Sequence, residues 1–242
     1  MKLVAAHARV LVLELVRYPA YVVPTLLFPA AFFLVFAPPH ARLPATIEMT
    51  GFAAFAVIGV AFFQFGVGIA ADRGSAWEAY LRTLPVAPLE RLVARVLSAV
   101  PFASGAAALV VVAASATTAA SLPVAAWFEF AAVLAVGLVP FALLGLALGY
   151  LAPPRGALPI ANLLYLGLAY GGGLWLRPSR LPAGIAAASP YLPTRAFADA
   201  LAGAVSGRPF IPGAALRLGA FALAFGALAV WAYRRDEGRR YR

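Results

Sequence analysis

The stretch GFAAFAVIGVAFFQFGVGIAA, residues 51–71, runs for twenty-one residues without a charged side chain. A membrane-spanning helix needs about 20 consecutive, mainly apolar residues to cross the hydrocarbon core of a bilayer. Residues 51–71 meet this requirement and contain one strongly polar side chain, that of Gln64. We therefore expect this stretch to form a helix that spans a membrane.

The composition of the whole chain indicates the same class of protein. Of its 242 residues, 64% are hydrophobic and 12% are charged, and the mean hydropathy is +0.90. Soluble domains are about 45–50% apolar and about 25% charged. A water-soluble globule built from this chain would expose too much apolar surface. We predict an all-α polytopic membrane protein in which residues 1–242 form one transmembrane domain.

Six segments in all are long and apolar enough to span a bilayer. They cover residues 18–37, 51–71, 96–117, 125–151, 157–176 and 215–233. The first segment contains three prolines, and a proline inside a helix removes a backbone hydrogen bond and causes a kink. Two Gly-x-x-x-Gly patterns, at 145–149 and 167–171, are typical of helices that approach each other closely, although the pattern is a weak signal in a glycine-rich chain.

Lysine and arginine are distributed unequally over the predicted loops. If both termini lie on one side of the membrane, that side holds thirteen of these residues and the other side holds six. Because cytoplasmic loops carry the excess of positive charge, we expect a protein of the inner membrane with both termini in the cytoplasm. The net charge of +10 comes from arginines that cluster at the ends of apolar runs, as membrane topology requires. We therefore do not expect nucleic acid as a partner.

The first seventeen residues have an amphipathic pattern, because one half of their helical wheel is apolar. The other half contains Lys2, His7, Arg9, Glu14 and Arg17. This pattern favours an interfacial helix on the inner membrane surface, and the alternative is that residues 3–16 extend the first span. An acidic residue and three prolines are untypical of a signal peptide, so we expect this region to be retained.

The longest predicted loop, residues 177–214, lies on the external side. Within it, SPYLPTRAFADALAGAVSG (189–207) indicates a turn followed by a short helix, with Pro193 at its first position and Gly207 at its C-terminal cap. Apolar residues recur every four positions, at Phe197, Leu201 and Val205. Two interpretations remain open: the helix dips into the membrane or packs across the external mouth, or it covers the bundle as a surface helix.

A second short helix is predicted in the polar stretch DRGSAWEAYLRTLPVAPLER, residues 72–91. Ser75 and Glu78 have the spacing of a capping box, Arg82 follows Glu78 at the i+4 position that favours an ion pair, and Pro85 ends the helix. One apolar stripe is formed by Trp77, Leu81 and Leu84. Eight or nine residues are fewer than the roughly 12–15 that are marginally stable alone in water, so we expect this helix to dock on membrane or protein.

Motifs for enzymatic chemistry are absent from the sequence. The chain has no GxxxxGK[ST] phosphate loop, no HExxH and no GxSxG. It contains no cysteine and two histidines far apart in sequence, which excludes a metal cluster of these ligands. We expect no enzymatic activity, no metal site and no cofactor in this chain.

Few polar residues lie deep in the predicted spans. Glu129 is the one ionisable residue expected inside a span and away from the helix ends. Coupled secondary transport usually needs such groups inside the spans. The neutral residues Gln64, Asn162 and Tyr165 either form hydrogen bonds between helices or line a translocation path. Any energy for transport is expected to come from another chain.

Two segments carry a resemblance to a known family. The stretch Arg73-Gly74-Ser75-x-x-Glu78-x-x-Leu81-x-Thr83-Leu84-Pro85-Val86 places an acidic residue five positions before a Thr-x-Pro turn, and Ser189-Pro190-Tyr191-Leu192-Pro193 precedes the last span. Together with six spans and cytoplasmic termini, they resemble the membrane-spanning subunits, or permeases, of type-2 ATP-binding cassette (ABC) exporters. Residues 196–204 depart from the family, because they are rich in alanine and lack the arginine that often follows the aspartate.

The resemblance implies that two permease chains form a path and that two separate ATP-binding subunits, which hold ATP and Mg²⁺, drive it. The residues implied in coupling to those subunits are Arg73, Ser75, Trp77, Glu78, Leu81, Arg82 and Pro85. The residues implied in the path are Gln64, Asn162 and Tyr165, and those of an external gate are Pro190, Pro193, Phe197 and Asp199. The implied substrate is hydrophobic or amphipathic: a drug, an antibiotic or a lipid. The alternatives are a haem-exporter-type permease, an ATP-independent channel or carrier, and an accessory membrane protein.

Overall fold

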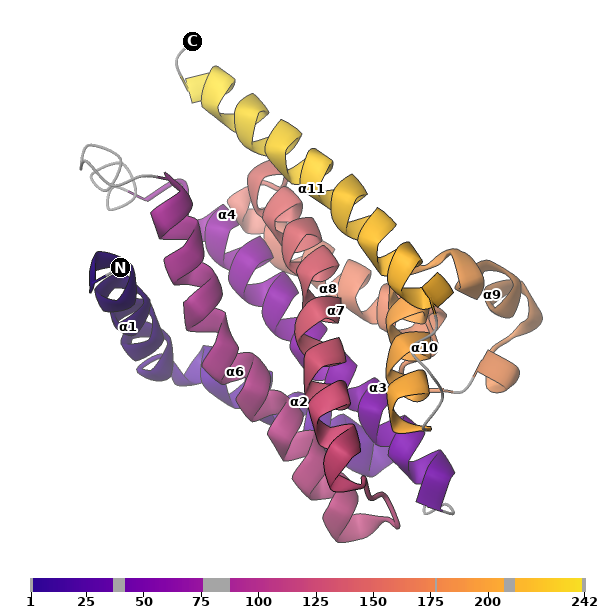
Figure 1. The fold of residues 1–242 in the computed structure, drawn as a ribbon. Coiled ribbons are helices and arrows are strands. Elements are labelled where there is room, and N and C mark those ends of the chain that lie inside the picture. The colour runs from indigo at the N-terminus through magenta and orange to yellow at the C-terminus, as the bar shows by residue number, and fades with distance from the viewer. Residues whose placement is uncertain (1, 37–41, 76–87, 177, 207–211, 241–242) are drawn as a thin grey trace.

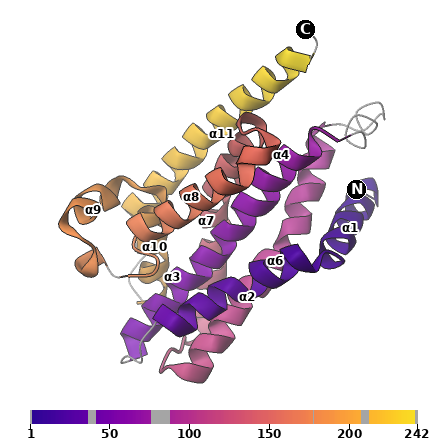
Figure 2. The same ribbon diagram turned by 180° about the vertical axis from the view of Figure 1, so that it is seen from behind.

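The computed structural model of the protein describes residues 2–36, 42–75, 88–176, 178–206 and 212–240. The regular elements in these residues are all helices, which run side by side in a bundle (Figures 1 and 2). They are α1 (Lys2–Val16), α2 (Pro19–Phe36), α3 (Arg42–Val60), the π-helix η1 (Ala61–Val67), α4 (Gly68–Asp72), α6 (Pro88–Thr117), α7 (Val124–Leu151), α8 (Pro154–Gly171), α9 (Ala183–Ala188), α10 (Pro193–Val205) and α11 (Pro212–Arg240), with 3₁₀ turns η2 (Pro178–Arg180) and η3 (Ser189–Tyr191).

The centre of the bundle is one long helix made of α3, η1 and α4, which follow one another directly. In the most apolar 18-residue window of Leu43–Asp72, 83% of the residues are buried, against 17% for Pro19–Phe36 and for Gly213–Glu237. Figure 2 shows this helix crossing the middle of the molecule, between α2 and α6 on one side and α8 on the other. The apolar run 51–71 is therefore the core around which the other helices pack.

Five helices in the described part of the chain are long and apolar enough to cross a membrane. They are Pro19–Phe36, Leu43–Asp72, Glu90–Thr117, Val124–Leu151 and Gly213–Glu237. The predicted span 157–176 corresponds to α8, which ends at Gly171 before a turn in which Gly173 has a φ of 77°. Arg155, Asn162 and the prolines of α8 lower its hydropathy, so the sixth predicted span is not confirmed.

The second span begins nine residues earlier than predicted, at Arg42 instead of residue 51. Its added turns contain two buried threonines whose hydroxyls have partners inside the protein. The Thr46 hydroxyl donates to the Ser121 carbonyl at 3.3 Å, and the Thr50 hydroxyl donates to the Ile47 carbonyl at 2.8 Å. Because these hydroxyls have hydrogen-bond partners inside the protein, the helix can begin earlier in the sequence than hydropathy alone predicted.

The N-terminal helix α1 is separate from the first span, because it ends at Val16 and α2 begins at Pro19. It packs against α6 and points away from the direction of α2 in both ribbon views (Figures 1 and 2). The alternative that residues 3–16 simply extend the first span is therefore wrong. The position of α1 on a membrane surface stays a prediction.

Helix α10, predicted between residues 193 and 207, packs into the bundle against α3, α7, α8 and α11. The three residues of its apolar stripe, Phe197, Leu201 and Val205, are all buried. Gly137 of α7 makes room for the Phe197 ring, since a Cβ at Gly137 would lie 2.0 Å from that ring. The predicted short helix is therefore present and buried against the bundle, and its position relative to a membrane or an external mouth stays a prediction.

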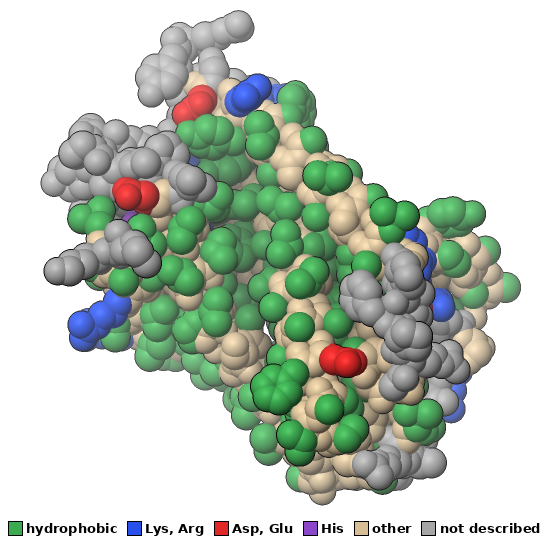
Figure 3. Space-filling model, in the orientation of Figure 1, with side chains coloured by type: hydrophobic (Ala, Val, Ile, Leu, Met, Phe, Trp, Pro, Cys, Tyr) green, Lys and Arg blue, Asp and Glu red, His purple; other side chains and the backbone are tan. Residues whose placement is uncertain are grey.

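Apolar side chains cover most of the face formed by α6, α7 and α11 (Figure 3). Large exposed examples are Phe128 on α7 and Leu216 and Leu223 on α11, each more than three-quarters exposed. Such a surface would be unfavourable in water and suits contact with lipid. The helices and their outer surface together describe a multi-pass membrane protein.

Candidate functional site

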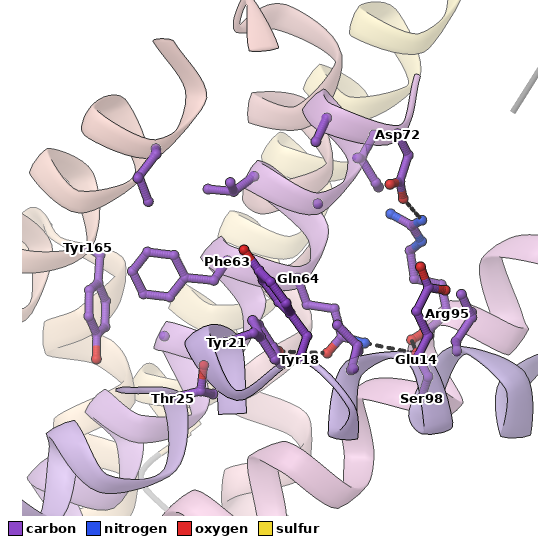
Figure 4. Close-up of a pocket in the computed structure, with 18 of the residues that line it drawn as sticks. Glu14, Tyr18, Tyr21, Thr25, Phe63, Gln64, Asp72, Arg95, Ser98 and Tyr165 are labelled. Carbon is purple, nitrogen blue, oxygen red and sulfur yellow. Dashed lines mark hydrogen bonds and ion pairs between the residues drawn. The ribbon is translucent and has the colours of Figure 1, made fainter. Parts of the chain in front are cut away.

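A groove with a volume of about 970 Å³ runs along the central helix (Figure 4). Its walls come from α1 and α2 on one side and from α8 on the other, with η1, α4 and the start of α6 between them. Its neutral polar lining includes Tyr18, Tyr21, Thr25, Gln64, Ser98, Tyr150, Asn162, Tyr165 and Tyr233. The groove therefore brings together all three residues that were predicted for a translocation path.

Gln64 lies in the middle of the π-helix η1 and joins two neighbouring helices. Its Nε2 donates to the Ser98 hydroxyl of α6 at 2.8 Å, and the Tyr21 hydroxyl of α2 donates to its Oε1 at 3.3 Å. Ser98 in turn donates to the Arg95 carbonyl at 2.8 Å. A π-helix is rare and is frequently found at functional sites, so the local geometry agrees with a functional role for Gln64.

Tyr165 forms the opposite wall of the groove and is almost completely buried. Its ring stacks on Phe55 at a centroid distance of 4.3 Å, and its hydroxyl donates to the Phe55 carbonyl at 3.1 Å. A Cβ at Gly59 would lie 2.9 Å from this hydroxyl, so glycine is required for the close approach. Asn162, one helical turn earlier on α8, lines the groove beside it.

The charged lining of the groove gathers near the end of α4. The Arg95 guanidinium forms an ion pair with Asp72 (Figure 4). Of the residues predicted on the polar face of α1, His7 and Glu14 line the groove, whereas Arg9 and Arg17 are exposed and do not. The groove thus has a polar, aromatic middle and a charged end in which acids and arginines occur together.

Most of the predicted coupling residues lie outside the described residues: Trp77, Glu78, Leu81, Arg82 and Pro85. Arg73 is described, and its side chain points into the protein. Its guanidinium donates to the carbonyls of Tyr150 and Ala152 at the end of α7, the latter at 2.6 Å, and pairs with Asp236 of α11 at 2.7 Å. Ser75 is exposed directly before the segment that is not described. Arg73 therefore connects helices within this chain.

The residues predicted for an external gate lie apart from the groove. Asp199 accepts from Arg195 at 2.7 Å and from Arg217 of α11 at 2.9 Å, and Arg217 also donates to the Pro190 carbonyl at 3.2 Å. These bonds fix α10 and the preceding turn to α11. Phe197 and Pro193 are buried in the packing of α10, so the structure gives this segment a clear structural role.

Two kinds of residue were missed by sequence reasoning. Glu48 lies within the helix Leu43–Asp72, because α3 begins before the predicted span, and it lines a second cavity of about 520 Å³ with Arg195 and Asp199. The prediction that Glu129 is the one ionisable residue inside a span is therefore wrong. Ser98 was missed because a single serine in an apolar helix carries no sequence signal until its partner is known.

No family model matches the chain. A protein of Bacillus subtilis (strain 168) that carries the name "Putative transport permease YvfS" is 23% identical to it over 190 residues, which are 76% of this chain and 78% of that protein. This distant similarity covers most of both chains. With the apolar helices and the lined groove, it supports a membrane protein of the transport permease type.

Proposed function

We propose that this chain is the membrane-spanning subunit of an ATP-driven exporter of the type-2 ABC class. The observation that carries this proposal is the groove of about 970 Å³ along the central membrane helix, with Gln64, Asn162 and Tyr165 in its lining. Its volume lies within the range of sites for drug-sized ligands. Its aromatic rings, hydroxyls and amides suit a hydrophobic or amphipathic substrate such as a drug, an antibiotic or a lipid.

The arrangement of charge favours an energy source outside this chain. The arginines Arg73 and Arg95 at the charged end of the groove are each paired with an aspartate of the same chain. Such pairs hold the helix ends together. They give no reason to assign these charged residues to transport driven by an ion gradient. ATP-binding subunits, with ATP and Mg²⁺, supply the energy in this proposal, and the sequence has no phosphate loop of its own.

A second permease chain, identical or homologous, completes the path in this proposal. The groove is open along helices that would lie in lipid, and a polar substrate group inside it would be costly if lipid were its only neighbour on the open side. Covering the groove with a second chain removes this cost. The C-terminal end of α11 and the end of α4 lie at the same end of the bundle (Figure 1). In this proposal that end faces the cytoplasm, in agreement with the distribution of arginine.

The partner assignment is tested by co-purification with the ATP-binding protein encoded beside this gene. We expect a stable complex whose ATPase activity is stimulated by substrate. Replacing Glu78 with arginine reverses the charge in the predicted coupling helix, so ATPase stimulation or complex formation is expected to be lost while membrane insertion is retained. Normal assembly and transport by Glu78→Arg would contradict the coupling role. Solute movement in liposomes without ATP would instead indicate a self-contained carrier.

Replacing Gln64 with leucine, which has a similar size, tests the path. The change removes the bonds to Ser98 and Tyr21, and Ser98 keeps its bond to the Arg95 carbonyl. We expect a loss of about 1 kcal/mol in stability, equal to an unfolding temperature about 2–4 °C lower. ATP-dependent dye accumulation in inside-out vesicles is expected to fall about tenfold, because a polar substrate group in the path loses a hydrogen-bond partner, at a cost of about 1–1.5 kcal/mol.

The control for Gln64→Leu is Thr117→Val, because Thr117 is exposed and its hydroxyl bonds within its own helix, to Ala113. This variant is expected to transport normally. Unchanged transport by Gln64→Leu, together with the small loss of stability, would show that Gln64 serves as a hydrogen bond between helices and does not belong to the path.

A further inference from the structure

The last turns of α11 separate their charges onto two faces. Asp236 points into the protein, where it pairs with Arg73 at 2.7 Å. Glu237 accepts a hydrogen bond from the Tyr233 hydroxyl at 2.5 Å and lines the groove. Both acids of this helix end are therefore engaged within the chain.

The opposite face of the same turns is basic and open to the surroundings. Arg234 and Arg235 are exposed, and the Arg235 guanidinium lies 5.2 Å from the ring centre of Trp231, which is 51% exposed. At 100° per residue, both arginines lie within about 60° of Trp231, whereas Asp236 and Glu237 lie about 120° or more away. We name Trp231, Arg234 and Arg235 the outer face of α11.

The outer face lies where a membrane helix leaves the hydrocarbon core. The apolar segment of α11 runs from Gly213 to Glu237, so Trp231 and the two arginines occupy its last turns. Tryptophan is enriched at the level of lipid headgroups, and arginine binds phosphate oxygens through two parallel N–H groups. Beyond these turns the sequence adds three more arginines, Arg239, Arg240 and Arg242.

We propose that the outer face of α11 is a binding surface for anionic phospholipid headgroups. The acids that could otherwise neutralise Arg234 and Arg235 are engaged elsewhere, Asp236 with Arg73 and Glu237 with the Tyr233 hydroxyl. A phosphodiester pairs with the arginines, and the Trp231 ring packs beside the headgroup. Basic residues next to a membrane helix are a known attraction for anionic lipid surfaces, and here the fold assigns this role to two exposed side chains.

The experiment uses the full chain, purified in dodecyl maltoside and titrated with phosphatidylglycerol or phosphatidylcholine. Thermal unfolding is measured at each lipid concentration. We expect phosphatidylglycerol to raise the unfolding temperature with saturation, and phosphatidylcholine to have little effect. The double variant Arg234→Gln, Arg235→Gln is expected to need about 20- to 30-fold more phosphatidylglycerol for half saturation, since each arginine contributes about fivefold.

Two further variants make the result specific. Arg234→Lys, Arg235→Lys keeps the charge and is expected to lose only part of the response, because lysine lacks the paired donors of arginine. Arg180→Gln removes an exposed arginine of η2 and is expected to behave as the wild type. An unchanged response of the Gln double variant would overturn the proposal, as would an equal response to phosphatidylcholine. Loss of binding to the ATP-binding protein without loss of the lipid response would assign the face to a protein partner instead.

Discussion

Replacing Arg73 with glutamine is expected to lower the unfolding temperature of the purified chain by about 6–12 °C. The side chains of Arg73 and Asp236 are only 14% and 12% exposed. Removal of one partner leaves the other charge buried without compensation, at a cost of about 3 kcal/mol. The carbonyls of Tyr150 and Ala152 at the end of α7 lose their donor as well, and a cation at this position also interacts favourably with the helix dipole.

The control is Arg155→Gln at the exposed start of α8, which is expected to change the unfolding temperature by less than about 2 °C. Arg73→Lys keeps the charge without the branched donors of arginine, so an intermediate loss is expected. Equal unfolding temperatures for Arg73→Gln and Arg155→Gln in detergent would falsify the structural role. In that case Arg73 would be available for a partner subunit, as its sequence context predicted.

Asp72 and Arg73 together hold the end of the central helix on two sides. Asp72 pairs with Arg95 of α6, and Arg73 reaches α7 and Asp236 of α11. The next residues lead into the segment proposed to contact the ATP-binding subunit. If that segment is displaced, the two ion pairs pass the displacement to both sides of the bundle at once. Under the proposed function, Arg73 would transmit such a displacement within the chain and would not itself dock on the ATP-binding subunit.

The sequence predicted the helical class and the approximate position of the long spans, because uninterrupted apolar runs are visible without tertiary information. It predicted the start of the second span wrongly, since Thr46 and Thr50 look polar until their backbone partners are known. The contacts of Arg73 within the chain were not predicted, for a similar reason. Its partner Asp236 is 163 residues away, and sequence reasoning had only local neighbours to consider.

The candidate site was predicted in part. Gln64, Asn162 and Tyr165 were selected as polar residues inside apolar segments, and the structure places all three on one groove. The π-helix that contains Gln64 was not predicted, because no local residue pattern distinguishes it from an α-helix. The groove itself depends on the distance between α2 and α8. That distance results from the packing of both helices around the central helix, so the sequence of no single segment predicts it.

Replacing Gly145 with alanine is expected to lower the unfolding temperature by about 6–12 °C, at a cost of about 3 kcal/mol. A Cβ at Gly145 would lie 2.6 Å from the Ala61 carbonyl oxygen, and one at Gly149 would lie 2.6 Å from that of Phe65. Both obstacles are backbone atoms of the central helix, which do not move aside as a side chain does. The pattern at 145–149 is therefore the contact on which α7 and η1 pack.

The matched control for Gly145→Ala is Gly167→Ala in α8, because nothing lies within 4 Å of a Cβ at Gly167. Alanine inside a helix is favoured over glycine by about 0.5–1 kcal/mol, so the unfolding temperature of the single chain is expected to rise by about 1–4 °C. The first glycines of the two patterns, Gly145 and Gly167, thus predict opposite signs for the same substitution. If Gly167→Ala instead disrupts a complex of two permease chains, then the pattern at 167–171 is used between chains, which agrees with a groove that a second chain completes.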